Sequence, residues 1–338
     1  MKTLVCTKPG QLDYIEKAEP ELKKGFAIVR IRNIGICGTD LHAFEGTQPF
    51  FNYPRILGHE LSGELVDFDG ASGFRKGEVV SFLPYLNCGT CIACRAGKTN
   101  CCTSLQVCGV HIDGGMADYY AIPSRLLVHG QGLDFTKLAM VEPLAIGAHA
   151  VRRASIQRGE MVLVMGAGPV GMGVMAFARL AGAEIIAMDV NTKRLEFCRS
   201  KLGIQHIIQA GEDDIIEQLL ELTHGDMPTI VMDASGNKKA INQGLQYLAH
   251  GGRFILVGLQ KEELIFSHPE LHKREATLMS SRNATREDFD WVIKNIENGS
   301  INPLSFVTNR VKFDETADRF PEWLNPASLI VKVIVEKD

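Results

Sequence analysis

Short apolar segments alternate with amphipathic segments between residues 159 and 284, and this alternation restricts the fold more than any other feature of the chain. The segments MVLVM, EIIAMDV, TIVMDAS and RFILVGL have the composition and length of buried strands, and helical patterns separate them. Strands that alternate with helices indicate βαβ units. We therefore predict an α/β fold with a doubly wound parallel sheet in this part of the chain.

A glycine-rich turn follows the first of these strands. Gly166, Gly168 and Gly171 fit the pattern G-x-G-x-x-G, with MVLVM before them and an apolar helical pattern after them. The first glycine permits a tight turn, the second lets backbone N–H groups approach a pyrophosphate, and the third lets helix and strand pack closely. Together with Pro169 and Val170, these glycines are predicted to bind a dinucleotide. The alternative is a purely structural turn.

An acidic residue ends the second strand, as a dinucleotide site requires. Asp189 lies 18 residues beyond the motif, where a carboxylate can accept both ribose hydroxyls of NAD and would repel the 2′-phosphate of NADP. Lys193 and Arg194 lie nearby and weaken that exclusion. Arg194 and, at the end of RFILVGL, Val257 and Gly258 are further candidate cofactor contacts. The sequence thus favours NAD as the cofactor.

Four cysteines in the first half have the spacing C-x2-C-x2-C-x7-C: Cys88, Cys91, Cys94 and Cys102. Four thiolates can surround one tetrahedral Zn²⁺, and a site with four protein ligands is closed, so this zinc would hold a loop and do no chemistry. Four unrelated buried cysteines or a disulfide knot would be the alternatives. Spacing alone leaves open whether Cys101 replaces Cys102 as the fourth ligand.

A second group of residues suits a metal of a different kind. Cys37 follows the end of an alternating strand pattern, GFAIVRIRNIGIC, and Gly58-His59-Glu60 follows 22 residues later. Cys37, His59 and a carboxylate could provide three ligands and leave a position open for water or substrate, as catalytic zinc requires. Taken singly, Cys37 could be a small buried hydrophobe and His59 a core histidine.

The first half is otherwise rich in short strands between glycine turns, which suggests a partly closed barrel or sandwich. Residues 138–154 are predicted to be helical, and so are FDWVIKNIENGS and DETADRFPEWL near the C-terminus. The segment 328–335, SLIVKVIV, is predicted to be a final strand that could rejoin the first domain.

Composition excludes some partners. The formal net charge of −4 and the lack of a basic stripe argue against nucleic acid. The uncharged run 161–178 has the length of a membrane span, but glycines and a proline interrupt it, so we predict no membrane insertion. Nine cysteines without a secretory signal suggest a reducing compartment, and we predict a cytoplasmic protein.

The motifs GICGTDLH, GHE, the cysteine spacing, VEPLA and GAGPVG occur in an order that resembles the zinc-dependent medium-chain alcohol and polyol dehydrogenases, including the sorbitol, threonine and sugar-acid dehydrogenase branch. The resemblance covers essentially the whole chain. It implies a GroES-like catalytic domain (residues 1–147, with the structural zinc lobe at about 86–105), a Rossmann NAD-binding domain (148–284) and a C-terminal return to the catalytic domain (285–338). It also implies a homo-tetramer or homo-dimer.

By the same resemblance, Cys37, His59 and Glu60 bind a catalytic zinc, which makes two Zn²⁺ per chain. Glu142, in VEPLA, matches a residue that binds this zinc directly or through water. Thr39 matches the hydroxyl that relays the substrate proton, and His42 is the next candidate in the relay.

The implied reaction is the reversible, NAD-linked oxidation of a secondary hydroxyl to a ketone. A sugar acid, a hexonate such as galactonate, is the predicted substrate, and a polyol of the sorbitol or galactitol type or threonine is the alternative. His111 and Arg282 lie in segments that look like those of sugar-acid oxidising members. An arginine could bind a substrate carboxylate with both oxygens. The alternatives are an ordinary loop histidine and a surface or interface arginine.

Two other functions are compatible with parts of the pattern. A zinc-free quinone or enone reductase would need neither GHE nor the cysteine lobe, and the chain has both. A non-catalytic NAD-binding protein would not need Cys37, His59 or Thr39, and all three are present.

Overall fold

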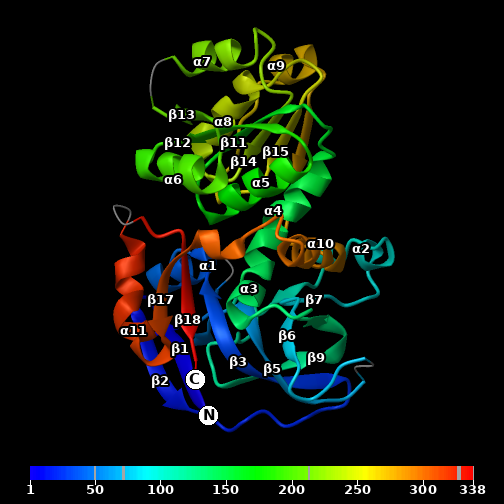
Figure 1. Cartoon of the computed structure of the whole chain (residues 1–338), viewed down its shortest axis with the longest axis vertical. Coiled ribbons are helices and arrows are strands. Elements are labelled where there is room, and N and C mark those ends of the chain that lie inside the picture. The colour runs from blue at the N-terminus through cyan, green and yellow to red at the C-terminus, as the bar shows by residue number, and fades with distance from the viewer. Residues whose placement is uncertain (49–50, 71–72, 212–213, 326–328, 338) are drawn as a thin grey trace. The chain divides into compact units, whose positions relative to one another are not determined.

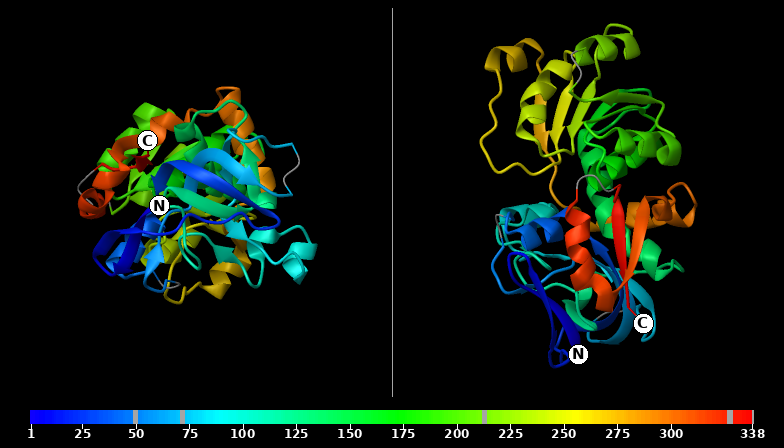
Figure 2. Two further views of the ribbon diagram at one scale, coloured as in Figure 1. Left: turned by 90° about the horizontal axis from the view of Figure 1, so that it is seen from below. Right: turned by 90° about the vertical axis from the view of Figure 1, so that its left-hand side faces the viewer.

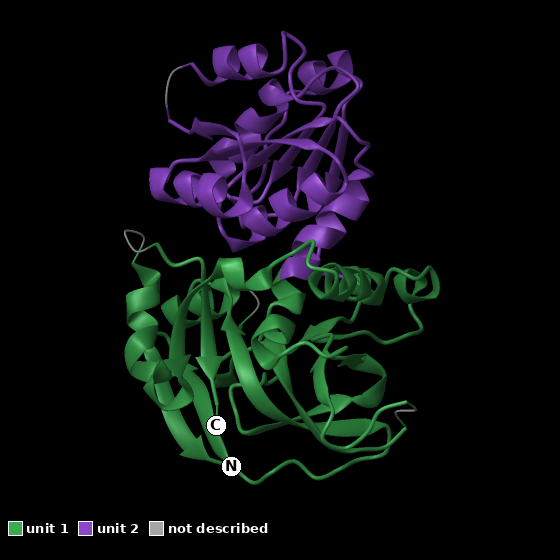
Figure 3. Ribbon diagram, viewed as in Figure 1, with its two compact units in different colours: residues 1–143, 285–338 green, residues 144–284 purple. Residues whose placement is uncertain are grey.

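The computed structural model describes the whole chain except residues 49–50, 71–72, 212–213, 326–328 and 338. It divides into two compact units. Unit 1 consists of Met1–Pro143 and Thr285–Asp338, and unit 2 of Leu144–Ala284 (Figures 1 and 3). The chain therefore leaves unit 1, forms unit 2 and then returns to unit 1.

Unit 1 is built mainly of strands. These are β1 (Lys2–Lys8), β2 (Gln11–Glu16), β3 (Phe26–Ile36), β4 (Arg55–Ile56), β5 (Glu60–Phe68), β6 (Val79–Phe82), β7 (Tyr85–Leu86), β8 (Gln106–Val107), β9 (Tyr119–Pro123), β10 (Leu127–His129), β17 (Val307–Lys312) and β18 (Lys332–Glu336). The largest sheet has seven strands in the order β10-β6-β5-β3-β18-β17, with β9 also paired to β3. A three-stranded sheet (β2-β1-β4) and the pair β7-β8 complete the unit.

The last strand brings the C-terminus back to the first part of the chain. Strand β18 is antiparallel to β3, with Val333 opposite Ile36, and parallel to β17. The predicted final strand is thus confirmed from Lys332 onward, although Ser328, its predicted first residue, lies outside the described residues. This pairing places Lys332 beside the end of β3, and the consequence for the metal site is described below.

The helices of unit 1 are α1 (Gly38–Glu45), α2 (Ile92–Arg95), α3 (Phe135–Ala139), α10 (Arg286–Glu297) and α11 (Thr316–Arg319), and α4 (Val141–Ala154) leads from unit 1 into unit 2. Two helix predictions need correction. The predicted helix 138–154 is divided at Met140 into α3 and α4. DETADRFPEWL forms α11 between two short 3-10 segments, because Pro321 has no N–H with which to continue an α-helix.

Unit 2 has a six-stranded parallel sheet in the order β13-β12-β11-β14-β15-β16. Its strands are β11 (Met161–Met165), β12 (Glu184–Asp189), β13 (His206–Gln209), β14 (Ile230–Asp233), β15 (Arg253–Leu256) and β16 (Thr277–Ser280). Its other helices are α5 (Pro169–Leu180), α6 (Thr192–Leu202), α7 (Ile215–Leu222), α8 (Lys238–Gly244) and α9 (His268–Lys273). Helices lie on both faces of the sheet (Figure 2), and the predicted α/β fold with a doubly wound parallel sheet is confirmed.

The apolar run 161–178 is part of this sheet layer. It forms β11, the glycine turn and most of α5, and β11 is buried between its neighbours β12 and β14. Across the described ranges, no helix combines the length and the apolar composition that a membrane span requires.

Candidate metal and cofactor sites

The structure brings the four predicted cysteines of the lobe together. Cys88, Cys91, Cys94 and Cys102 have sulfur atoms within 4.8 Å of one another, and the Sγ atoms of Cys88 and Cys94 are 4.0 Å apart. Tetrahedral coordination with Zn–S bonds of 2.3 Å needs sulfurs about 3.8 Å apart, so the spacing fits zinc. All nine cysteines are free thiols, which excludes the disulfide knot. Cys102 is buried within the group, whereas Cys101 is exposed and outside it.

Hydrogen bonds from the backbone prepare two of these thiols for a metal. The N–H of Thr90 and the N–H of Cys91 lower the pKa of Cys88 to about 5, and the Cys91 nitrogen is 3.3 Å from that sulfur. The N–H of Cys94 is the largest of several causes that lower the pKa of Cys91 to about 7. Thiolates are the form that binds zinc, so the lobe holds at least one ligand already deprotonated at neutral pH.

A second, buried group joins the end of β3 to the start of β5. Ligand atoms of Cys37, His59 and Glu60 lie within 4.8 Å of one another. Antiparallel pairing puts Glu60 opposite Gly35, so that Cys37, two residues beyond, lies near His59. Cys37 caps the N-terminus of α1, and its sulfur accepts the N–H of Thr39 at 3.5 Å. His59 and Glu60 are 5% and 1% exposed, whereas Cys37 is half-buried.

Asp40 fixes the geometry of this cluster, and the sequence analysis did not single it out. Its side chain is fully buried, accepts the N–H of Cys37 at 2.9 Å and accepts the N–H of Gly58 at 3.2 Å. It also lies 3.8 Å from Nδ1 of His59, a buried atom without a hydrogen-bond partner. The signal in the sequence was the spacing of Cys37 and Asp40, which is that of a capping box.

Burial and neighbouring charges change the pKa values of this cluster. Burial raises the pKa of Asp40. Burial alone would lower the pKa of His59, but the charges of Asp40 and Cys37 raise it well above its ordinary value. A thiolate, a carboxylate and an imidazole whose buried Nδ1 has no hydrogen-bond partner are a donor set that suits Zn²⁺. The residues therefore fit the predicted catalytic metal.

Glu60 is held by a buried lysine. Nζ of Lys332 lies 2.5 and 2.6 Å from the two oxygens of Glu60 and donates to the carbonyl of Ile36 at 3.0 Å. Burial would lower the pKa of Lys332, but the charge of Glu60 raises it above its ordinary value. Lys332 was missed because it is a single charge in the apolar run SLIVKVIV, and its partner is 272 residues away in sequence.

Glu142, the fourth predicted ligand, is held by a different group. It lies in the first turn of α4, is 4% exposed and accepts a hydrogen bond at Oε1 from the hydroxyl of Tyr85. Burial raises its pKa to about 7. Glu142 is not among the residues whose ligand atoms lie within 4.8 Å of one another, although its charge acts on His59 and Lys332.

The two residues predicted to carry the proton lie on α1. Thr39 is half-buried, two residues after Cys37, and His42 is exposed one helical turn further on. Nδ1 of His42 lies 3.3 Å from the carboxylate of Glu45 and 3.2 Å from the hydroxyl of Thr47. The step from the half-buried Thr39 to the exposed His42 has the direction that a proton relay to solvent needs.

The dinucleotide motif lies at the carboxyl end of the parallel sheet in unit 2. Gly166 has a φ of +101°, and a Cβ there would lie 2.8 Å from the backbone nitrogen of Ser235. A Cβ at Gly171 would lie 1.8 Å from the carbonyl oxygen of Gly166. By contrast, Gly168 caps α5, with Pro169 and Val170 in the first turn, and faces open space where its Cβ would be. The turn therefore leaves the helix N-terminus open to an anion.

Asp189 ends β12 and is nearly buried, at 8% exposed. Its carboxylate accepts the N–H of Ala167, within the glycine turn, at 2.6 Å and the N–H of Asn191 at 2.7 Å. Asn191 in turn caps α6 by accepting the N–H groups of Lys193 and Arg194. Asp189, which is predicted to bind the ribose, thus also fixes the glycine turn.

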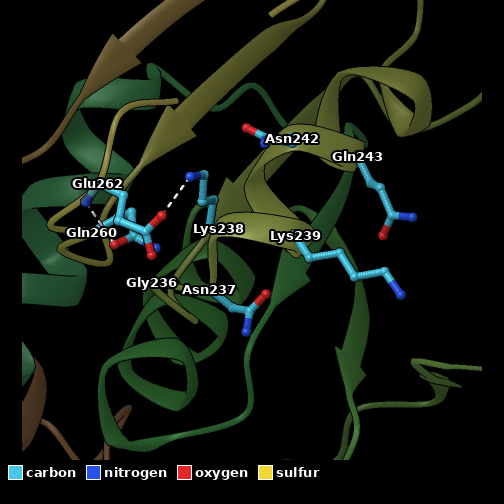
Figure 4. Close-up of a pocket in the computed structure, with 8 residues that line it drawn as sticks. All are labelled: Gly236, Asn237, Lys238, Lys239, Asn242, Gln243, Gln260 and Glu262. Carbon is cyan, nitrogen blue, oxygen red and sulfur yellow. Dashed lines mark hydrogen bonds and ion pairs between the residues drawn. The ribbon is translucent and has the colours of Figure 1, made fainter. Parts of the chain in front are cut away.

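Val257 and Gly258 follow β15, where their N–H groups bond to the carbonyl of Asp233 at 2.8 and 2.9 Å. A Cβ at Gly258 would lie 2.3 Å from the nitrogen of Gly236. Gly236 also borders an open polar pocket of about 620 Å³, in which Lys238 forms an ion pair of 2.5 Å with Glu262 (Figure 4). This pocket was not predicted from the sequence, and it contains none of the predicted site residues.

The two candidate substrate residues lie in different units. His111 is half-buried in unit 1, and its Nδ1 accepts the N–H of Val107 at 3.1 Å. Arg282 is exposed in unit 2, two residues after β16. Their roles at a substrate site remain predictions.

Known proteins are similar to this chain in sequence and in fold. Residues 23–131 match the alcohol dehydrogenase GroES-like domain, and residues 169–298 match the zinc-binding dehydrogenase family. The chain is 40% identical to L-galactonate-5-dehydrogenase of Escherichia coli K12 over 99% of its own length and 98% of that protein. It is 32% identical to sorbitol dehydrogenase of Halalkalibacterium halodurans over 93% and 94% of the two chains.

A solved structure agrees with these matches. The fold superimposes with a TM-score of 0.93 on an alcohol dehydrogenase (rspB) of Escherichia coli CFT073 in complex with NADH, at 28% identity over 100% of this chain and 99% of that one. The predicted GroES-like domain, the Rossmann sheet and the dehydrogenase class are confirmed, and the protein belongs to the zinc-dependent medium-chain dehydrogenases.

Proposed function

We propose that this dehydrogenase oxidises a secondary hydroxyl of a sugar acid, a hexonate such as galactonate, to the keto acid, reversibly and with NAD. The observation that carries the proposal is the buried group of Cys37, His59 and Glu60, in a chain that matches a galactonate dehydrogenase over nearly its whole length. Two Zn²⁺ per chain, one in each cysteine-containing site, belong to the proposal.

Within this proposal, Cys37 and His59 hold the metal, with Glu60 and Glu142 as the nearby carboxylates. A zinc bound there would supply a Lewis acid that lowers the pKa of the substrate hydroxyl. Thr39 takes the hydroxyl proton and His42 passes it to solvent. NAD⁺ bound to unit 2 would supply the hydride acceptor for the carbinol carbon, so that alcohol and NAD⁺ would give ketone, NADH and one proton.

On the cofactor side, Asp189 accepts the ribose hydroxyls, and the N-terminus of α5 faces the pyrophosphate. Replacing Asp189 with asparagine removes the charge and keeps an acceptor for the N–H of Ala167. We expect native enzyme to favour NAD over NADP in kcat/KM, and Asp189→Asn to narrow that ratio by about tenfold, which corresponds to about 1.4 kcal/mol of lost discrimination. Equal kcat/KM with both cofactors in the native enzyme would disprove the preference.

The substrate class is tested by comparing a carboxylate-bearing substrate with its alditol. We expect kcat/KM to be highest for L-galactonate, lower for galactitol and sorbitol, and lowest for threonine. If Arg282 binds the substrate carboxylate, Arg282→Ala lowers kcat/KM on the aldonate and not on the alditol, whereas equal losses would remove Arg282 from the site. The polyol alternative is supported by the sorbitol dehydrogenase relative, and higher activity on the alditol would establish it.

We further propose that units 1 and 2 act as the catalytic and the NAD-binding domain, and that the enzyme is a cytoplasmic homo-tetramer or homo-dimer. Sedimentation of the purified full chain would measure the number of subunits.

A further inference from the structure

The two carboxylates near Cys37 and His59 are held by groups of opposite character. Glu60 is paired through both oxygens with the cation of Lys332, and it belongs to the group of close ligand atoms. Glu142 receives a neutral phenol hydroxyl at one oxygen and does not belong to that group. The partner of each carboxylate therefore differs in charge and in the number of oxygens that it occupies.

Tyr85 is well placed to fix a side chain. It is 5% exposed on β7, and its ring meets that of Phe289 edge-to-face, with centroids 6.4 Å apart. Its backbone is fixed by pairing with Val107 of β8. A buried phenol needs a hydrogen-bond acceptor, and Glu142 supplies one. The ring packing and the strand pairing thus define where the hydroxyl meets the carboxylate.

From this geometry we propose that Tyr85 is a positioning residue for Glu142. By donating to Oε1, it fixes the rotamer of the carboxylate and leaves the other oxygen for the metal or for a water bound to the metal. Glu142 then acts through a single oxygen, while Lys332 keeps Glu60 engaged. Groups that orient metal ligands by hydrogen bonding contribute to metal affinity as well as to activity. The proposal rests on the metal site of the proposed function and adds a residue to it.

The test replaces Tyr85 with phenylalanine, which keeps the ring contact and removes only the hydroxyl. Tyr120→Phe is the matched control, because Tyr120 is a half-buried tyrosine of unit 1 whose hydroxyl lies 3.0 Å from Sγ of Cys108 and 2.9 Å from the carbonyl oxygen of Asp113. Both variants are prepared as the full chain with zinc retained in the cysteine lobe and Co²⁺ exchanged into the other site, as checked by metal analysis.

We expect Tyr85→Phe to shift the visible absorption bands of Co²⁺ and to weaken Co²⁺ binding by about 10- to 100-fold in chelator competition. Tyr120→Phe should leave the bands unchanged and the affinity within about twofold, although both variants lose a hydrogen-bonded phenol hydroxyl. Glu142→Gln should shift the bands as well, and the double variant Tyr85→Phe/Glu142→Gln should shift them no further than Glu142→Gln alone.

Unchanged bands and affinity in Tyr85→Phe would overturn the proposal, and so would an equal change in Tyr120→Phe. These readouts need no substrate, so they are separate from the test of the proposed function. A native enzyme without activity on any aldonate would overturn the substrate class alone. A native enzyme that holds no metal at Cys37 would overturn both.

Discussion

The cysteine lobe and the cluster of Cys37, His59 and Glu60 are two candidate metal sites of different construction within unit 1. The lobe takes all its ligands from 15 consecutive residues, Cys88 to Cys102, and three of its four cysteines are exposed or half-buried. The other site takes its residues from the ends of β3 and β5, with Glu142 of α4 and Lys332 of β18 beside them. One site is a local feature of the chain, and the other exists only when distant segments meet.

The electrostatics of the two sites differ in the same way. In the lobe, backbone N–H groups lower the pKa of Cys88 to about 5, so the protein itself favours negative charge there. In the buried site, burial raises the pKa of Asp40 and of Glu142, the latter to about 7. A closed set of four thiolates saturates its ion. A set in which carboxylates are tethered by other residues can leave a position for substrate.

The largest expected effect comes from removing the thiol of Cys37. Cys37→Ser should reduce turnover below detection, because the metal that would polarise the substrate loses its thiolate ligand. The circular dichroism spectrum should stay that of the folded protein. The zinc content, measured by metal analysis, should fall from two ions per chain to one. Cys101→Ser, which alters an exposed cysteine outside both groups, is the control and should keep full activity. Normal turnover of Cys37→Ser would contradict the assignment of a catalytic metal to this site and a structural metal to the lobe.

Removing a ligand of the cysteine lobe should lower the stability of the protein more than its turnover. Cys91→Ser should remove one zinc and destabilise the fold by about 4–5 kcal/mol, as losses of structural metal do. With an unfolding entropy of about 2.1 cal/mol/K per residue, a chain of 338 residues loses roughly 1.4 °C of Tm per kcal/mol, so the Tm should fall by about 6–7 °C. Turnover per folded molecule at low temperature should decrease far less than in Cys37→Ser. Loss of turnover without loss of Tm would contradict the structural role.

Lys332→Met tests whether the buried carboxylate depends on its lysine. Without the lysine, Glu60 is a buried charge without its partner, and the metal-free protein should lose about 3–5 kcal/mol of stability. Zinc should restore part of that loss, because the metal offers Glu60 another cation. The control is Lys337→Met, which removes an ion pair of 2.9 Å with Asp118 outside the cluster. Denaturant unfolding with and without zinc measures both, and equal zinc dependence in the two variants would contradict the assignment.

The smallest expected effect is a coupling between the two sites. Strands β7 and β8 flank the lobe, and Tyr85 on β7 bonds to Glu142, so disorder in the lobe should reach the buried carboxylate through Tyr85. Cys91→Ser should therefore weaken Co²⁺ binding at Cys37 severalfold in the native background and less in the Tyr85→Phe background. The interaction energy in this double-mutant cycle should be about 0.5–1 kcal/mol. Strict additivity would show that the two sites are independent.

Sequence by itself determined the features that depend on neighbours along the chain. The cysteine spacing defined the lobe, and the alternation of strands and helices defined the sheet of unit 2, because a metal loop and a βα unit are each specified within a few tens of residues. Asp40 was also within reach of the sequence, since its bond to Cys37 closes over three residues. The resemblance to the dehydrogenase family supplied Glu142 and Thr39, which their spacing alone did not identify.

Tertiary structure alone decided which groups hold the two carboxylates. Lys332 is a charge in an apolar strand until β18 pairs with β3 and places its ammonium against Glu60. Tyr85 is an ordinary strand aromatic until the chain brings Glu142, 57 residues away, to its hydroxyl. Periodicity predicts that such side chains are buried, but it carries no information on their partners, because a buried polar group is satisfied by whichever partner the packing brings within hydrogen-bond distance.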